Sequence, residues 1–101
     1  MVGTAEHRLL AREAVAKSLV LLKNEAQTLP LSKSTPTIRI AGQAADDIGL
    51  QCGGWTIEWL GKPGPITPGK TILSGIKAAL SHPDRVVYDP DGLFAQLGDQ
   101  A

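Results

Sequence analysis

The sequence predicts an α/β fold with parallel strand pairing. Helix-like and strand-like segments alternate along the 101 residues, two short segments are rich in β-branched residues, and a helical segment separates these two. Alternation of this kind is typical of a parallel sheet whose strands are joined by a right-handed crossover. Only two strands and two helices are clear, which makes a thin core. We therefore expect the chain alone to have low stability.

The first predicted element is a helix from Ala5 to about Asn24, with Thr4 as its N-cap. Apolar residues recur along it at helical spacing and form two stripes. One stripe contains Ala11, Val15, Leu19 and Leu22, and the other contains Leu9, Ala16 and Val20. The run at 19–22 is apolar on every side, which indicates burial against several neighbours. Pro30 then ends regular structure, since proline lacks a backbone donor and restricts the residue before it.

The middle of the chain predicts a short strand and a brief helical turn. The short segment 37–41 is rich in β-branched residues, which favours a strand that ends at Gly42. Residues 45–50 predict one helical turn with an aspartate as its cap. A turn at residues 67–69 follows, because it contains a Pro-Gly pair.

A second helix and a second strand are predicted in the last third of the chain. Residues 71–80 predict the helix, and the side chains expected on its inward face are Ile72, Leu73, Ile76 and Leu80. Pro83 breaks it, and residues 85–88 predict the strand. Residues 94–97 predict the start of another helix.

The overall composition excludes several classes of function. Ten Lys and Arg balance ten Asp and Glu, so no basic field attracts nucleic acid or an anionic membrane. No apolar segment is long enough to span a bilayer, and the N-terminus lacks the pattern of a signal peptide. The lone Cys52 allows neither an internal disulfide nor a zinc site, and His7 and His82 lack ligand spacing. We expect no metal and no cofactor, while the compartment stays open.

The feature most indicative of function is a pair of tryptophans. Trp55 and Trp59 are the only two in a chain with 4% aromatic residues, and they lie between the Gly53-Gly54 pair and a Gly/Pro-rich stretch at 61–65. An indole on a loop offers a flat apolar surface and one N–H donor, which suits stacking on a sugar ring. Burial in the core remains the alternative, and it is strongest for Trp55. The glycine pair allows a sharp bend, a close approach of the backbone to a ligand or an ordinary turn.

Several segments together resemble the second domain of family 3 glycoside hydrolases, the β-glucosidase and exo-β-glucanase group. The run Ala45-Asp46-Asp47-Ile48-Gly49-Leu50-Gln51-Cys52-Gly53-Gly54-Trp55-Thr56-Ile57-Glu58-Trp59 carries the most specific part of the likeness. It is supported, in order and spacing, by Ser18-Leu19-Val20-Leu21-Leu22-Lys23-Asn24, Leu29-Pro30-Leu31, Ile38-Arg39-Ile40-Ala41-Gly42 and Thr71-Ile72-Leu73-Ser74-Gly75-Ile76. The resemblance covers nearly the whole chain.

The resemblance implies a fold and an activity for the parent enzyme. It implies a partial α/β sandwich with a parallel sheet and flavodoxin-like layering, preceded by a long helix and paired with a barrel domain. In that family the barrel supplies the nucleophilic Asp, and a later loop of the second domain supplies the acid/base Glu. The parent then cleaves β-glucosides or β-glucan oligosaccharides with retention of configuration. By the same resemblance, Trp59 lines the subsite of the leaving sugar and Trp55 supports it, whereas Leu60 departs from the usual Gln.

The resemblance also implies an organisation of the chain. Residues 1–28 correspond to a linker and the helix that leads into the domain, and residues 29–101 to the N-terminal portion of the α/β domain. Residues 2–7 resemble the linker of a larger protein, and residues 98–101 stop where the next core strand is expected. We therefore expect a piece of a larger enzyme, whose parent is secreted, periplasmic or in another compartment.

The carboxylates of this segment do not form a catalytic pair. Retaining hydrolysis needs two carboxyl groups about 5 Å apart on either side of the bond, and the adjacent Asp46 and Asp47 cannot straddle a sugar. We expect them to cap the turn after the first strand. Glu58 is expected in an extended stretch, pointing away from both indoles. Two rival functions remain: a stand-alone carbohydrate-binding module, and a nucleotide-binding α/β domain, which the missing Gly-x-Gly-x-x-Gly motif disfavours.

Overall fold

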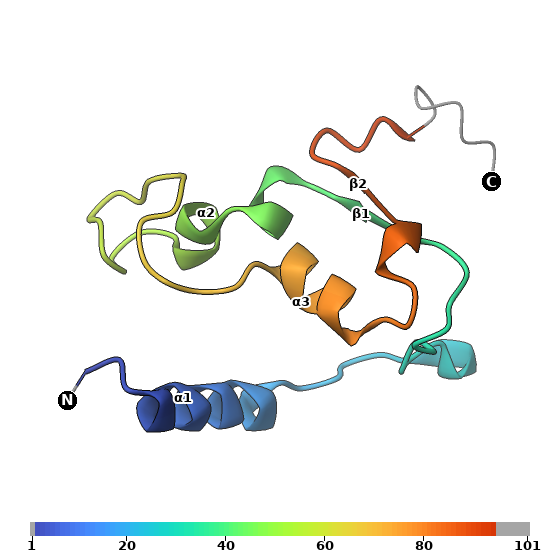
Figure 1. Cartoon of the computed structure of the whole chain (residues 1–101), viewed down its shortest axis with the longest axis horizontal. Coiled ribbons are helices and arrows are strands. Elements are labelled where there is room, and N and C mark those ends of the chain that lie inside the picture. Colours follow the sequence, from blue (N-terminus) through green and yellow to red (C-terminus); the bar gives the residue numbers. More distant parts are fainter. Residues whose placement is uncertain (1, 95–101) are drawn as a thin grey trace. The chain divides into compact units, whose positions relative to one another are not determined.

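The computed structural model describes residues 2–94, which divide into two compact units, one up to Leu31 and one from Ser32 onward (Figure 1). The first unit contains helix α1 (Ala5–Ser18) and the 3₁₀ turn η1 (Glu25–Gln27). The second contains, in order, β1 (Ile38–Ala41), η2 (Gln43–Asp46), α2 (Ile48–Cys52), α3 (Ile72–Ala79), η3 (Pro83–Arg85) and β2 (Val86–Asp89). The helix expected at 94–97 falls almost entirely outside the described residues.

Helix α1 begins as the sequence predicts. The Thr4 hydroxyl oxygen accepts a hydrogen bond from the backbone N–H of His7 at 3.2 Å, which confirms the N-cap. Glu13 and Lys17 form an exposed ion pair at 2.8 Å, one helical turn apart. No residue of α1 is buried, so local capping and side-chain pairs define this helix more than packing does.

The predicted continuation of α1 to Asn24 is wrong, and so is the predicted burial of residues 19–22. The helix ends at Ser18, and Leu19 is extended with φ −70° and ψ 137°. The four apolar side chains that follow are between 61% and 91% exposed. The Ser18 hydroxyl donates to the carbonyl oxygen of Val15 at 2.8 Å, a local bond that competes with helix continuation. Without packing against its apolar residues, the helix has little to extend it.

The parallel pairing of the two strands is confirmed. β1 and β2 form a two-stranded parallel sheet in which Ile38 lies opposite Val86 and Ala41 lies opposite Asp89. Along β1, partly buried and exposed residues alternate, as expected for a strand with one covered face. The Tyr88 hydroxyl donates to the Gly42 carbonyl oxygen at 3.1 Å and ties the end of β1 to β2. Two parallel strands with helices between them agree with a partial α/β fold, and the sandwich layering stays a prediction.

Helix α3 also matches the sequence pattern, with one correction. The Thr71 hydroxyl caps it by accepting from the N–H of Ser74 at 3.1 Å. Leu73 is buried, with 5% of its surface exposed, whereas Ile72 is 57% exposed and its predicted inward position is wrong. Leu73, Ile76 and Leu80 share one helical stripe, and Ile72 lies about 100° away from Leu73 around the axis. In the described part of the chain, Leu73 is the one apolar side chain that is buried.

Because Leu73 is buried and Ile72 is mostly exposed, truncating Leu73 should be far more harmful than truncating its neighbour. We expect Leu73→Ala to lower the free energy of unfolding by about 2–5 kcal/mol, enough to abolish a cooperative transition in a small domain. Ile72→Ala, on the exposed side of the same helix, should change it by less than about 0.5 kcal/mol. Urea unfolding followed by circular dichroism measures both. Equal effects of the two substitutions would contradict this assignment of the core.

Candidate functional site

The two tryptophans lie on a loop that starts and ends at the short helix α2. We call residues 53–64 the tryptophan loop. At its start, the N–H of Gly53 bonds to the carbonyl oxygen of Gly49 at 3.2 Å, within the last turn of α2. At its end, Gly64 accepts from the N–H of Gly49 at 2.9 Å and donates its own N–H to the Asp47 carboxylate. Both ends of the loop are therefore fixed to one helical turn.

The ends come so close together that glycine is required at the contact points. A Cβ built on the buried Gly49 would overlap the carbonyl oxygen of Lys62. A Cβ on Gly61 would lie 3.3 Å from the carbonyl carbon and oxygen of Gly53, and Gly61 itself has φ +87°. The glycines thus allow two backbone segments to pass each other at the base of the loop.

Inside the loop the backbone turns tightly. The N–H of Trp55 bonds to the carbonyl oxygens of Glu58 and Trp59 at 3.0 and 3.1 Å. Trp55 and Ile57 both have φ +63°, a left-handed conformation that is unusual for a β-branched residue such as Ile57. The expected extended stretch around Glu58 is therefore wrong, because a turn replaces it. The Gly54 Cβ position would lie 3.1 Å from the carbonyl oxygen of Trp59, so the close approach at this glycine is to the loop's own backbone.

Both indoles point into the open. Trp55 is 85% exposed and Trp59 is 65% exposed, which excludes the core alternative for Trp55 in this structure. Their ring centroids are 6.1 Å apart and their planes meet at 71°, an edge-to-face arrangement that aromatic pairs favour. Ile57 and Leu60, on the same loop, are also exposed. The loop therefore displays apolar side chains that the rest of the described chain does not cover.

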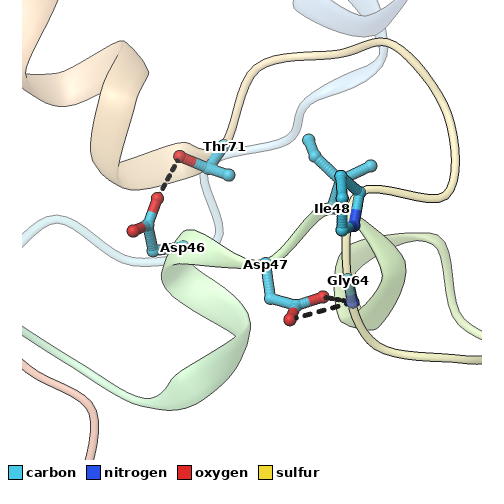
Figure 2. A pocket seen from close by; sticks show the side chains of 6 residues that line it. Asp46, Asp47, Ile48, Gly64 and Thr71 are labelled. Atoms are coloured by element: carbon cyan, nitrogen blue, oxygen red, sulfur yellow. Dashed lines mark hydrogen bonds between the residues drawn. The ribbon is translucent and has the colours of Figure 1, made fainter.

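A pocket lies at the base of the tryptophan loop, where the loop meets α2 and the start of α3 (Figure 2). Its volume is about 250 Å³, and its lining residues are Asp46, Asp47, Ile48, Gly64, Pro65 and Thr71. Ligand pockets usually measure about 300–1,000 Å³, so this one is small for a sugar. Among residues 2–94, no cluster of His, Cys, Asp or Glu is arranged to hold a metal ion.

The two aspartates of this pocket already have partners within the protein. The Thr71 hydroxyl donates to Asp46 at 2.8 Å (Figure 2). Asp47 accepts from the N–H of Leu50 at 2.9 Å, which makes it the N-cap of α2 and confirms the predicted capping role for this residue. The same prediction for Asp46 is wrong, because Asp46 lies inside η2 and binds the side chain of Thr71 instead. The arrangement can join loop, turn and helix, and it does not place two free carboxylates across a bond as hydrolysis requires.

Hydrogen bonding also lowers the pKa of Asp47. The backbone N–H groups of Leu50 and, second, of Gly64 lower the pKa of this carboxyl from its ordinary value of 3.8, because they stabilise the ionised form. The contact with Gly64 was not predicted from the sequence, since it joins residues 17 apart through the folded loop. The local signal, an aspartate before a helical turn, indicates a cap and says nothing about a second partner.

The described chain thus contains a small α/β unit that presents an exposed aromatic loop at helix α2. A comparison with protein families matches residues 19–100 to the glycosyl hydrolase family 3 C-terminal domain. The chain belongs to this family, as the resemblance of its sequence indicated.

Two curated relatives agree with this assignment. The chain is 38% identical over 82 residues, 81% of its length, to a periplasmic beta-glucosidase of Salmonella typhimurium strain LT2. It is 30% identical over 79 residues, 75% of its length, to a lysosomal beta glucosidase of Dictyostelium discoideum. In each case it spans about 10% of the relative's own length. Of the helices in residues 2–94, none is long and apolar enough to cross a membrane.

The pKa of Asp47 leads to a prediction about acid. Its folded-state pKa is lowered, so its contribution to stability is complete above the ordinary value of 3.8 and is lost as pH falls through the lower folded value. We expect the circular dichroism of the tryptophan pair to stay constant from neutral pH to about 4 and to decline only below that. Asp46→Asn should keep this step, since Asp47 is unchanged. A decline with its midpoint clearly above 3.8 would contradict the role of Asp47.

Proposed function

We propose that this chain contributes the aromatic wall of the leaving-sugar subsite in a retaining β-glucosidase or exo-β-glucanase. In this proposal Trp59 stacks on a glucosyl ring and Trp55 supports it from the side, on the loop that Gly53 and Gly54 open. The observation that carries the proposal is the exposed Trp59 indole on a fixed loop, in a family whose two relatives above are both named as beta-glucosidases.

Physical chemistry favours a ligand over that indole. Burying an aromatic side chain removes roughly 150–250 Å² from water, at about 25 cal/mol per Å² of apolar surface. A fold that leaves Trp59 65% exposed forgoes most of this gain until something covers the ring. A glucosyl ring matches the indole because its axial C–H groups make one face apolar while its hydroxyls remain in water.

Strain in the loop supports the same conclusion. Trp55 and Ile57 adopt φ +63°, and conformations of this kind cost on the order of 1–3 kcal/mol each. Such backbone conformations cluster where a binding or catalytic site needs side chains in a fixed place. Here the strained residues are one tryptophan and a residue between the two, so the strain falls on the segment that orients the indoles.

In this proposal the catalytic carboxyl groups come from outside this chain. Asp46 and Asp47 are occupied by hydrogen bonds within the domain, so neither is free to attack a sugar or protonate its leaving group. We propose that a barrel domain supplies the nucleophilic carboxylate and that a later loop of the α/β domain supplies the acid/base. The chain's partners are then that barrel and a β-glucoside or β-glucan oligosaccharide.

A stand-alone carbohydrate-binding module is the second candidate, because the two exposed indoles on one loop also suit binding without chemistry. The two candidates differ in affinity. One wall of a subsite should bind a disaccharide with a dissociation constant of about 1 mM or weaker, whereas a value below about 10 µM would favour the module.

Truncating the stacking ring should weaken sugar binding. We expect Trp59→Ala to lower the affinity for cellobiose or laminaribiose by about 2 kcal/mol, roughly 30-fold, as for other buried aromatic contacts. Isothermal titration calorimetry measures this loss. Ile57→Ala is the matched control, since Ile57 lies on the same loop and is 66% exposed against 65% for Trp59. Equal affinity of wild type and Trp59→Ala would refute the stacking role.

The isolated chain should not hydrolyse an aryl β-glucoside. The expected rate equals the uncatalysed background, because retaining hydrolysis needs a pair of carboxyl groups about 5 Å apart. Release of the coloured phenol, followed with purified chain, is the measurement. Reproducible turnover that disappears in Trp59→Ala would show that the catalytic groups lie within this chain.

A further inference from the structure

We propose that Asp47 is a positioning residue for the tryptophan pair: its carboxylate closes the tryptophan loop and so fixes the two indoles relative to each other. This positioning does not require a bound ligand, whereas its consequence for sugar binding rests on the proposed function above.

The carboxylate joins two elements that are distant in the sequence. Its Oδ1 accepts from the N–H of Leu50 and from the N–H of Gly64, both at 2.9 Å, and its Oδ2 lies 3.1 Å from the same Gly64 nitrogen (Figure 2). The first bond caps α2, and the others hold the far end of the loop. One side chain therefore sets both the start of the helix and the closure of the loop that follows it.

Both the N–H and the carbonyl oxygen of Gly64 form hydrogen bonds. Its N–H binds Asp47, and its carbonyl oxygen accepts from Gly49 and from Ile66, each at 2.9 Å. Gly64 has φ +101°, which a residue with a side chain rarely adopts. A charged acceptor makes the Asp47 bond the strongest of these, since charge-assisted hydrogen bonds are about twice as strong as neutral ones.

The indoles depend on the backbone of the loop and its fixed ends, because burial holds neither ring. Trp55 and Trp59 are mostly exposed, so burial contributes little to their placement. The hydrogen bonds within the loop come from one donor, the N–H of Trp55. Closing a loop costs conformational entropy that contacts at its ends must offset. Loss of the Asp47 bond would leave only the Gly49 N–H to tie Gly64 to α2. The looser loop would then let the two rings move apart from their 6.1 Å edge-to-face arrangement.

Two substitutions distinguish the bond of Asp47 to Gly64 from its role as the N-cap of α2. Asn is as good an N-cap as Asp, and its side-chain oxygen can still accept from Leu50 and Gly64. Asp47→Asn therefore removes the charge and the longer 3.1 Å contact but can keep both 2.9 Å bonds. Asp47→Ser also preserves the cap, because serine is a strong N-cap, but its side chain is too short to reach Gly64. Both variants should keep α2, while Asp47→Asn weakens the bond to Gly64 and Asp47→Ser removes it.

The readout is the coupling between the two indoles. Neighbouring indoles at this distance share their electronic transitions and give paired circular dichroism bands of opposite sign. Measured on the full chain at neutral pH without sugar, Trp55→Phe defines zero coupling. We expect Asp47→Ser to reduce the amplitude to about half or less of wild type, given the loss of a charge-assisted bond. Asp47→Asn should reduce it less, because its side-chain oxygen can still accept from Gly64. Asp46→Asn is the matched control and should retain the amplitude, since its amide oxygen can still accept from Thr71.

Each outcome decides the proposal. Reduced coupling in Asp47→Ser, with helical circular dichroism unchanged, supports it. Full coupling in Asp47→Ser, an equal loss in Asp46→Asn, or no coupling in wild type would each overturn it. Because the measurement needs no sugar, it tests the positioning role independently of the proposed function. Reduced coupling in Asp47→Ser, together with unchanged sugar binding in Trp59→Ala, would support the positioning role of Asp47 and refute the stacking role of Trp59.

Discussion

The closure of the tryptophan loop onto one helical turn is the constraint on which the site depends. Asp47 begins α2 and also binds the amide of Gly64, while Gly49 brings the loop's backbone against that helix. The loop therefore leaves and returns at the same place, directly after β1 and η2. The chain runs from β1 through η2 and α2 into the loop. This small part of an α/β domain therefore holds both indoles.

This constraint explains how exposed aromatic side chains keep a defined arrangement. Large side chains usually owe their position to packing in a core, but Leu73 is the one apolar side chain that is buried among residues 2–94. Trp55 and Trp59 are instead ordered by the backbone, through a tight turn and fixed ends, and by their contact with each other. Such a loop can offer its rings to a ligand without first taking them out of a core. Membership in glycosyl hydrolase family 3 is consistent with a carbohydrate as that ligand.

Local signals were enough to predict much of this fold. Thr4 and Asp47 each precede a helical segment and act as N-caps, and the β-branched segments around Ile38 and Val86 form the parallel pair. These features depend on residues within a few positions of each other, where the chemistry of one side chain and its neighbouring amides decides the result. The motif around Trp55 and Trp59 also identified the family from the sequence.

The remaining features depend on distant contacts and could not be read from local pattern. The apolar run at 19–22 has helical periodicity, yet the helix ends at Ser18 because packing does not extend it. Ile72 fits the amphipathic pattern as well as Leu73 does, and only the tertiary structure shows which one is covered. The bond between Asp47 and Gly64 spans 17 residues, so no spacing rule reveals it.

The most direct test of this account is the set of proton–proton contacts that the Trp59 ring makes in solution. Nuclear Overhauser measurements on the chain with labelled tryptophan and leucine report them. The account predicts contacts between the indole rings of Trp59 and Trp55, whose centroids are 6.1 Å apart, and none between Trp59 and the methyl groups of Leu73. Strong contacts between Trp59 and Leu73 would place the ring in the core and contradict the account.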